Sequence, residues 1–184
     1  MDNFTLPLGK MSSMIITAKD RNKRRRDKMV WSLLDHLKKK ESSDTITWEM
    51  LGGKKFMASK PTSHLDFVTA GTKGIPKLSV LNLADVLDVP MKDMATLLSL
   101  SYKTLGRKKE TDSLDTLASS LSIEIANTIT KGLSVFENFD KFNRWLHKEN
   151  RALKGKEPFS LLNTPTGIKV VNQVLGRIEE GIYT

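Results

Sequence analysis

The sequence predicts an all-α protein. Apolar residues recur at three- and four-residue steps over most of the chain, and the longest such stripe lies in residues 112–136. Proline stands early and glycine late in these segments, as at Pro165 and Gly181, which are the positions where helices accept them. Residues 45–57 alternate with a period of two instead, and there we expect a short β-hairpin.

Composition sets the broad class. The chain has 184 residues, 39% of them hydrophobic, which suffices for one or two small domains with a modest core. No apolar run approaches the roughly 18 residues of a spanning helix, and the start shows no leader sequence. With no cysteine, disulfides and cysteine zinc sites are excluded. We therefore expect a cytoplasmic protein that does not enter membranes.

The charge is strongly positive and unevenly distributed. The formal net charge is +9, and residues 1–65 carry 14 Lys and Arg against 7 Asp and Glu. Such a basic segment indicates a polyanionic partner, of which nucleic acid is the first choice.

The basic segment contains one predicted helix, over 29–40. Residues 1–20 show no period, and we expect them to be unordered without a partner. Arg24–Arg26 fall near the predicted start of the helix, where they oppose its dipole, and this suggests that they face an external anion. A solvated charge run is the alternative, and a membrane-surface helix fits less well because the apolar face is short. After the helix, Ile46, Trp48 and Met50 alternate before Gly52-Gly53, which predicts the hairpin.

Helices are predicted over 79–89, 91–100 and 101–110, with Ser101 as an N-cap. The last two, joined by a tight turn, form a helix-turn-helix, whose second helix reads DNA with residues near its start. Leu105 is predicted to be core. The alternative is the polar face of a small bundle. The predicted DNA contacts are Ser101, Tyr102, Lys103 and Thr104 for bases or phosphates, and Arg107, Lys108 and Lys109 mainly for phosphates.

Residues 112–136, capped by Asp112 or Ser113, predict a long helix that serves as core spine, dimer seam or both. Phe139, Phe142 and Trp145 should join the modules on either side. A short helix then opens at Pro158, and a longer one runs from Thr164 to Gly181. Periodicity alone makes this last segment an amphipathic helix on its own core, with a terminus free to fray.

No catalytic constellation is evident. His36, His64 and His147 are far apart in the sequence, and Glu179 and Glu180, being adjacent, diverge by about 100° on a helix. We expect no enzyme activity, no metal site and no cofactor.

A family resemblance adds a function to this pattern. The C-terminal region contains, in order, Asn150-Arg-Ala-Leu, Gly155, Pro158, Leu161-Leu162-Asn-Thr164, Gly167 and the final RIEEGIYT. Together these motifs resemble the toxin-binding domain of Xre/MbcA/ParS antitoxins. The helix-turn-helix before it resembles the Xre-type module of the same family. Glu149, Lys154 and Ser99 depart from the family pattern, which has Pro, Gly and Gly there.

The resemblance implies a bacterial type II antitoxin. Its regions would be a basic extension (1–65), a DNA-binding domain (66–137) and a toxin-binding domain (138–184). It would bind operator DNA as a homodimer and repress its own operon. It would also neutralise a toxin encoded in the same operon, a RES-domain protein that acts on NAD, by covering the active site of that toxin. The covering residues would be Arg177, Glu179, Glu180, Tyr183 and Thr184.

Two alternatives stay open. In one, the chain is a stand-alone transcriptional regulator whose C-terminal block dimerises. In the other, the basic N-terminal third is the main nucleic-acid contact and the helix-turn-helix is degenerate.

Overall fold

The fold is entirely helical in the part of the chain that the structure describes. The computed structural model covers the backbone of residues 18–182 and their side chains, apart from those of residues 18–22 and 24. The α-helices are α1 (Ala18–Lys38), α2 (Ser43–Met50), α3 (Leu65–Lys73), α4 (Lys77–Leu87), α5 (Met91–Leu97), α6 (Tyr102–Arg107), α7 (Thr116–Phe136), α8 (Phe139–Leu146) and α9 (Pro165–Glu179). Three short 3-10 helices are η1 (Gly53–Lys55), η2 (Arg151–Leu153) and η3 (Pro158–Leu161). The all-α prediction is confirmed.

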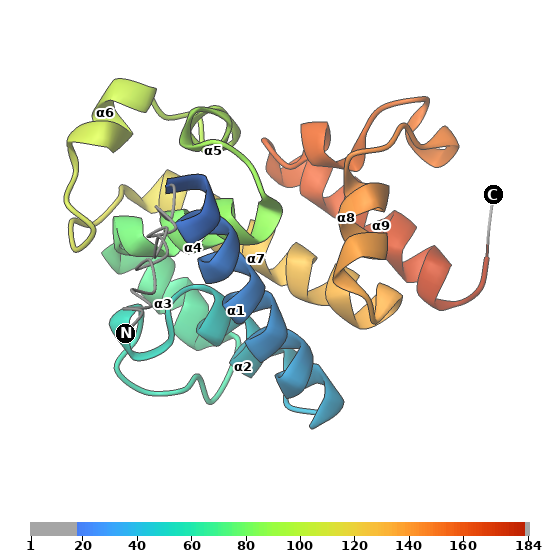
Figure 1. Cartoon of the computed structure of the whole chain (residues 1–184), viewed down its shortest axis with the longest axis horizontal. Helices are drawn as coiled ribbons and strands as arrows, with labels where there is room; N and C mark the ends of the chain where they lie inside the picture. Colours follow the sequence, from blue (N-terminus) through green and yellow to red (C-terminus); the bar gives the residue numbers. More distant parts are fainter. Residues whose placement is uncertain (1–17, 183–184) are drawn as a thin grey trace, which may run out of the picture.

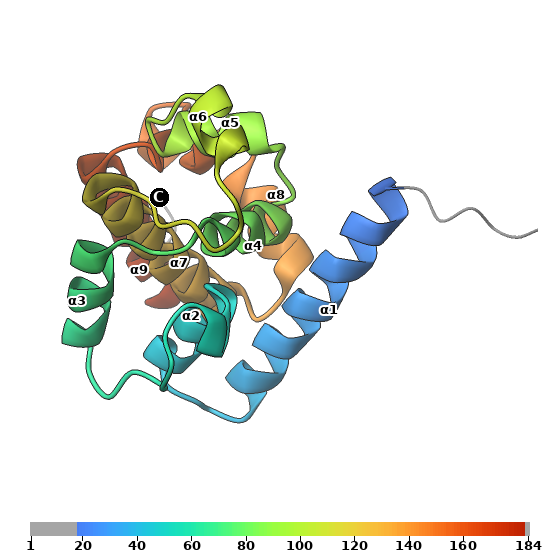
Figure 2. The ribbon, with the colours of Figure 1, turned by 90° about the vertical axis from the view of Figure 1, so that its left-hand side faces the viewer.

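Helix α7 is the centre of the molecule. It packs against α2, α3, α4, α8 and α9, and Figures 1 and 2 show it passing through the middle of the other helices. Ile125, Ile129 and Leu133 are completely buried along it. The apolar stripe predicted in residues 112–136 also includes Leu114 and Leu121, which are buried, and Leu117, which is exposed in the first turn. A helix with neighbours on several sides explains why its apolar face is so wide.

The start of α7 differs from the prediction. Its N-cap is Asp115, whose carboxylate accepts a hydrogen bond from the Ala118 N–H at 2.8 Å. The preceding residues are held extended, because the Leu114 N–H donates to the Ile75 carbonyl. Asp112 instead accepts from the Lys109 N–H. The helix therefore cannot begin at Asp112 or Ser113.

The predicted hairpin is wrong. Residues 43–50 form α2, which Ser42 caps by accepting from the Thr45 N–H. Ile46, Trp48 and Met50 are buried, and so are the neighbouring Thr45 and Thr47. A short helix enclosed by α1, α4 and α7 buries almost its whole circumference, so its sequence carries no clear helical period. Gly52 and Gly53 have positive φ, which lets the chain leave α2 into η1.

The arginines of α1 bind within the molecule. Because α1 begins at Ala18, Arg25 and Arg26 lie well inside it and the predicted opposition to the helix dipole is absent. The Arg25 guanidinium donates to Asn82 Oδ1 at 2.9 Å and lies 2.8 Å from Asp85 Oδ2, and Arg26 pairs with Asp88. Asp85 Oδ2 is therefore within ion-pair distance of Arg25, although it accepts no hydrogen bond from a described residue. Burial raises the pKa of the Asp85 carboxyl, and Arg25 lowers it by less. The expectation that these arginines face an external anion is corrected for these two residues.

The first 65 residues are joined to the rest by buried contacts. Leu33 of α1 and Leu51 after α2 are completely buried. The Thr47 and Thr130 hydroxyls lie 3.0 Å apart in the core, and the Ser79 hydroxyl donates to the Leu51 carbonyl at 2.6 Å. The N-terminal segment thus shares one core with α4 and α7. The prediction that residues 1–20 are unordered concerns two parts of the chain. Residues 1–17 lie outside the described residues, whereas residues 18–20 form the start of α1.

None of the helices in the described part is long and apolar enough to cross a membrane.

Candidate functional site

The predicted helix-turn-helix is formed by α5 and α6. Met94, Ala95 and Leu97 are buried on the inner face of α5, and Leu105, 1% exposed, anchors α6 as predicted. Ser101 caps α6 by accepting from the Thr104 N–H. Figure 1 shows α6 at the upper edge of the molecule, away from the central α7.

The turn between the two helices is held without glycine. Ser99 has φ 54°, in the left-handed region where the family pattern has Gly. The Leu100 N–H donates to the Ala95 carbonyl at 2.8 Å and the Ser99 N–H to that of Thr96. These bonds, with Leu98 buried beneath, hold the strained residue in place.

The predicted DNA-contacting residues divide into two groups. Ser101, Tyr102, Lys103, Thr104, Arg107 and Lys109 are exposed on or beside α6. Tyr102 is 59% exposed, which leaves its ring free to touch a partner. Lys108 is half-buried, and its ammonium group donates to the Ser113 carbonyl at 2.8 Å. Lys108 therefore holds the loop after α6 and is less free for a phosphate.

Sequence reasoning missed Lys77. Its ammonium group, at the start of α4, donates to the Lys108 carbonyl at 2.6 Å. It lies 3.5 Å from the Gly106 carbonyl as well. A cation against the last carbonyls of a short helix supports that end. No local signal could have revealed this, because the partners are about thirty residues apart in the chain.

The end of α9 is tied down as far as Ile182. Gly181 has φ 74°, the Ile182 N–H donates to the Arg177 carbonyl at 2.8 Å, and the Gly181 N–H donates to that of Ile178. This pair of bonds is a Schellman motif, which fixes the direction of the chain beyond the helix. The terminus is thus ordered by its own backbone up to this residue.

The predicted toxin contacts do not share one face. Arg177 lines a groove beside α8, whereas Glu179 lines a polar hollow of about 450 Å³ with Asp44, His64 and Lys131. Glu180 is exposed at the C-cap between them. Tyr183 and Thr184 lie outside the described residues. A partner over this end would contact both sides of α9.

The loop before α9 keeps its turn despite Lys154. This residue has φ 55° and Gly155 has φ 78°, so both positions are left-handed. Asn150 caps η2 through the Ala152 N–H and pairs its backbone with Lys156. The departure from glycine at this position therefore leaves the loop conformation intact.

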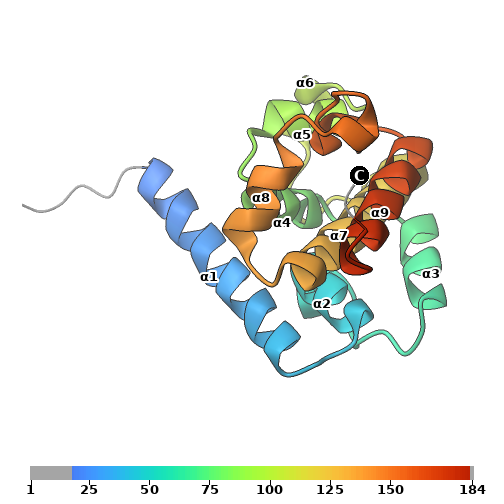
Figure 3. The same ribbon diagram turned by 90° about the vertical axis from the view of Figure 1, so that its right-hand side faces the viewer.

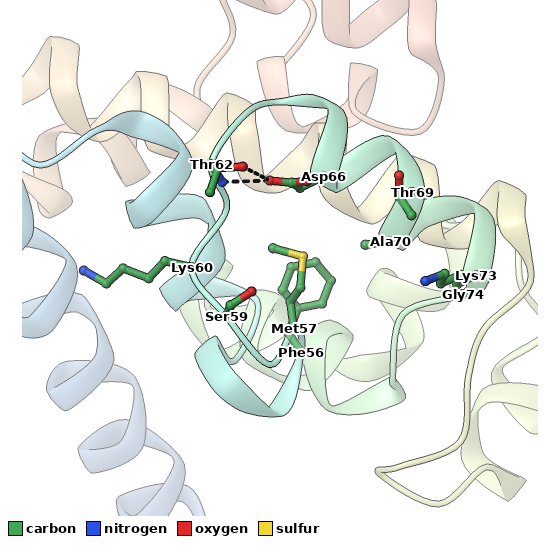
Figure 4. A pocket seen from close by; sticks show the side chains of 10 residues that line it. All are labelled: Phe56, Met57, Ser59, Lys60, Thr62, Asp66, Thr69, Ala70, Lys73 and Gly74. Atoms are coloured by element: carbon green, nitrogen blue, oxygen red, sulfur yellow. Dashed lines mark hydrogen bonds between the residues drawn. The ribbon is translucent and has the colours of Figure 1, made fainter.

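A further hollow, of about 390 Å³, lies between η1 and α3 (Figure 4). Its carboxylate, Asp66, already accepts from the Thr62 and Ser63 N–H groups at 2.7 and 3.1 Å. Lys60 points away and binds Glu41. Of the three charged residues that line the hollow, Asp66 and Lys60 thus bind groups other than each other, and Lys73 is the third. Within the described part of the chain, no three His, Asp or Glu side chains are placed to hold a metal ion.

Two family models match the chain. The antitoxin Xre-like helix-turn-helix domain matches residues 66–127. The antitoxin Xre/MbcA/ParS C-terminal toxin-binding domain matches residues 131–181. The chain belongs to the Xre/MbcA/ParS-type antitoxins. A comparison with curated proteins finds no match.

This antitoxin carries both family domains on one scaffold, so a toxin and DNA are its partners. Neither family is one of enzymes. Helix α7 contributes to both matches, since residues 116–127 belong to the first and 131–136 to the second. The contact residues of each site and the boundaries at 65 and 137 stay predictions.

Proposed function

We propose that this antitoxin neutralises a RES-domain toxin that acts on NAD, and represses the operon that encodes both proteins. The observation that carries the proposal is the presence of both family domains around one helix, α7. The C-terminal segment would cover the toxin's active-site pocket with Arg177, Glu179, Glu180, Tyr183 and Thr184. Because the proposed operator is DNA, we propose that the protein works in the cytoplasm.

The described part of the C-terminal segment suits this role. Its Schellman motif holds the backbone as far as Ile182, and Arg177, Glu179 and Glu180 are exposed. An ordered segment loses less conformational entropy on binding than a frayed one, which favours affinity. Charged side chains beside it can occupy a polar pocket without being substrates.

DNA binding would use α6 in the major groove. A short helix reads few bases, and each good base contact contributes about 1–3 kcal/mol of discrimination. A homodimer would present two such helices to two half-sites, which raises specificity. We therefore propose that the operator-bound form is a homodimer.

The decisive experiment is co-purification of the tagged chain with the product of the adjacent gene. A matched chain ending at Glu180 removes the terminal segment but keeps α9. We expect the full chain to retain its neighbour and restore growth, and the shortened chain to fold but fail to restore growth. Expression of the neighbour alone should deplete cellular NAD. If the full chain retains no neighbour, the stand-alone regulator replaces this proposal; if NAD is unchanged, the toxin is of another kind.

A further inference from the structure

An apolar groove of about 500 Å³ lies between the end of α7, α8 and the end of α9. Figure 3 looks at the side of the molecule that carries α8 and α9. Phe136, Trp145 and Ile178 line the groove, and Ala152 borders it from η2. Phe136 and Trp145 lie with ring centroids 5.5 Å apart, so they form a firm aromatic wall.

Among the described residues that line the groove, the charged side chains are both cations. Lys141 and Arg177 are the charged residues that line it. Within the described part of the chain, neither lies within ion-pair distance of a carboxylate. Cations beside an apolar, partly dry surface attract an anion more strongly than cations in open water do. The groove is therefore complementary to an acidic group.

A buried donor in the wall also lacks a partner. The Trp145 Nε1–H is inaccessible to water and makes no hydrogen bond to any residue that the structure describes. An unpaired buried N–H costs free energy, but no solvent reaches this one, so it adds nothing to the surface that a ligand in the groove would meet. What the groove offers a ligand is apolar contact and two cations.

We propose that this groove binds a segment of the toxin in which a large apolar side chain stands next to an Asp or Glu. The apolar side chain packs between Phe136 and Ile178, and the carboxylate pairs with Lys141 and Arg177. This inference rests on the proposed function. Arg177 belongs both to the groove and to the segment proposed to cover the toxin, so the two surfaces are continuous. A second copy of the chain is a poorer occupant, because its net charge of +9 opposes two cations.

The test reverses the charge at Lys141 and fills the groove at Ala152. Lys141 is exposed at the third position of α8, where glutamate suits the helix N-terminus, so Lys141→Glu should fold. Lys169→Glu makes the same charge change on the exposed face of α9 and is the matched control. We expect Lys141→Glu and Ala152→Trp to weaken affinity for the adjacent gene product at least about tenfold. Lys169→Glu should leave it within about twofold.

The outcomes separate the two proposals. If the wild-type chain binds no neighbour, the proposed function fails. If it binds and both groove variants bind equally well, the groove proposal alone is wrong. Altered oligomeric state in the free variants would instead assign the groove to a second copy. If Ala152→Trp fails to fold, the affinity of the Lys141→Glu variant alone tests the groove proposal. Toxin variants selected because they rescue Lys141→Glu should carry Lys or Arg in place of an Asp or Glu of the toxin.

Discussion

Gly132 shows how a single missing methyl group joins two regions. A Cβ at this position of α7 would lie 2.1 Å from the Phe142 ring of α8. Phe142 is 1% exposed and packs beside Phe136 and Trp145. Close approach of α8 to α7 therefore requires glycine here.

We expect Gly132→Ala to destabilise the protein by about 1–3 kcal/mol, because the ring must move in a packed core. Gly176→Ala is the control, since its Cβ would meet only the flexible end of Lys131. That change should be neutral or stabilising by up to about 1 kcal/mol, through helix propensity. Urea unfolding of both variants measures the difference. Equal effects would mean that the α7–α8 packing is looser than described.

Asp66 gives a pH dependence that can be assigned to one residue. Backbone N–H groups of Thr62 and then Ser63, with the Thr62 hydroxyl, hold the pKa of the Asp66 carboxyl below its ordinary value of 3.8. A carboxyl with a lowered folded pKa adds stability above pH 3.8, and this is lost as pH falls through the folded value. Wild type should therefore lose stability below that pH more steeply than Asp66→Asn. Denaturant unfolding over a pH series gives the difference curve, and a flat curve would contradict the assignment.

Most of the predicted DNA contacts lie on one element, helix α6. Lys103→Ala with Arg107→Ala removes two exposed cations while Leu105 continues to anchor the helix. We expect loss of operator preference and a slope of log affinity against log salt shallower by up to about 2. Lys54→Ala with Lys55→Ala removes the same charge from exposed positions in η1 and should change neither. Footprinting and salt titration measure both, and a retained footprint would remove α6 from the interface.

The N-terminal helices α1 and α2 are part of the common core of the molecule. Because α1 covers α2 and α4 with buried Leu33, deletion of the basic segment would expose core. Truncation is therefore a poor test of whether its basic residues bind nucleic acid. Charge changes at exposed residues such as Lys23 and Lys28 test this without removing α1.

We expect Leu33→Ala to destabilise the entire chain by about 2–5 kcal/mol in one cooperative transition. Trp31→Ala alters a 73% exposed side chain of the same helix, so its effect should stay within about 0.5 kcal/mol. Unfolding followed by circular dichroism and by fluorescence should coincide for the first variant. A separate early transition would show that α1 is an independent unit.

Local signals were sufficient for most helices and for the family. Three- and four-residue periods, Ser101 and Thr164 as caps, and Pro165 and Gly181 at the ends of α9 act within one or two turns. Such information stands in the sequence because side chains close in the chain decide it. The ordered motifs of the last forty residues likewise identified the toxin-binding domain.

Tertiary structure alone decided the rest. Helix α2 has no readable period because neighbours enclose it on several sides, and only the fold supplies those neighbours. Contacts between residues far apart in the chain pair Arg25 with Asp85 and bring the Lys77 ammonium group to the end of α6. The fold also makes Lys141 and Arg177 line the same groove. The sequence by itself thus determined the helices and the family. Packing determined which charges are already paired and which remain available to a partner, because pairing depends on distances that only the folded chain sets.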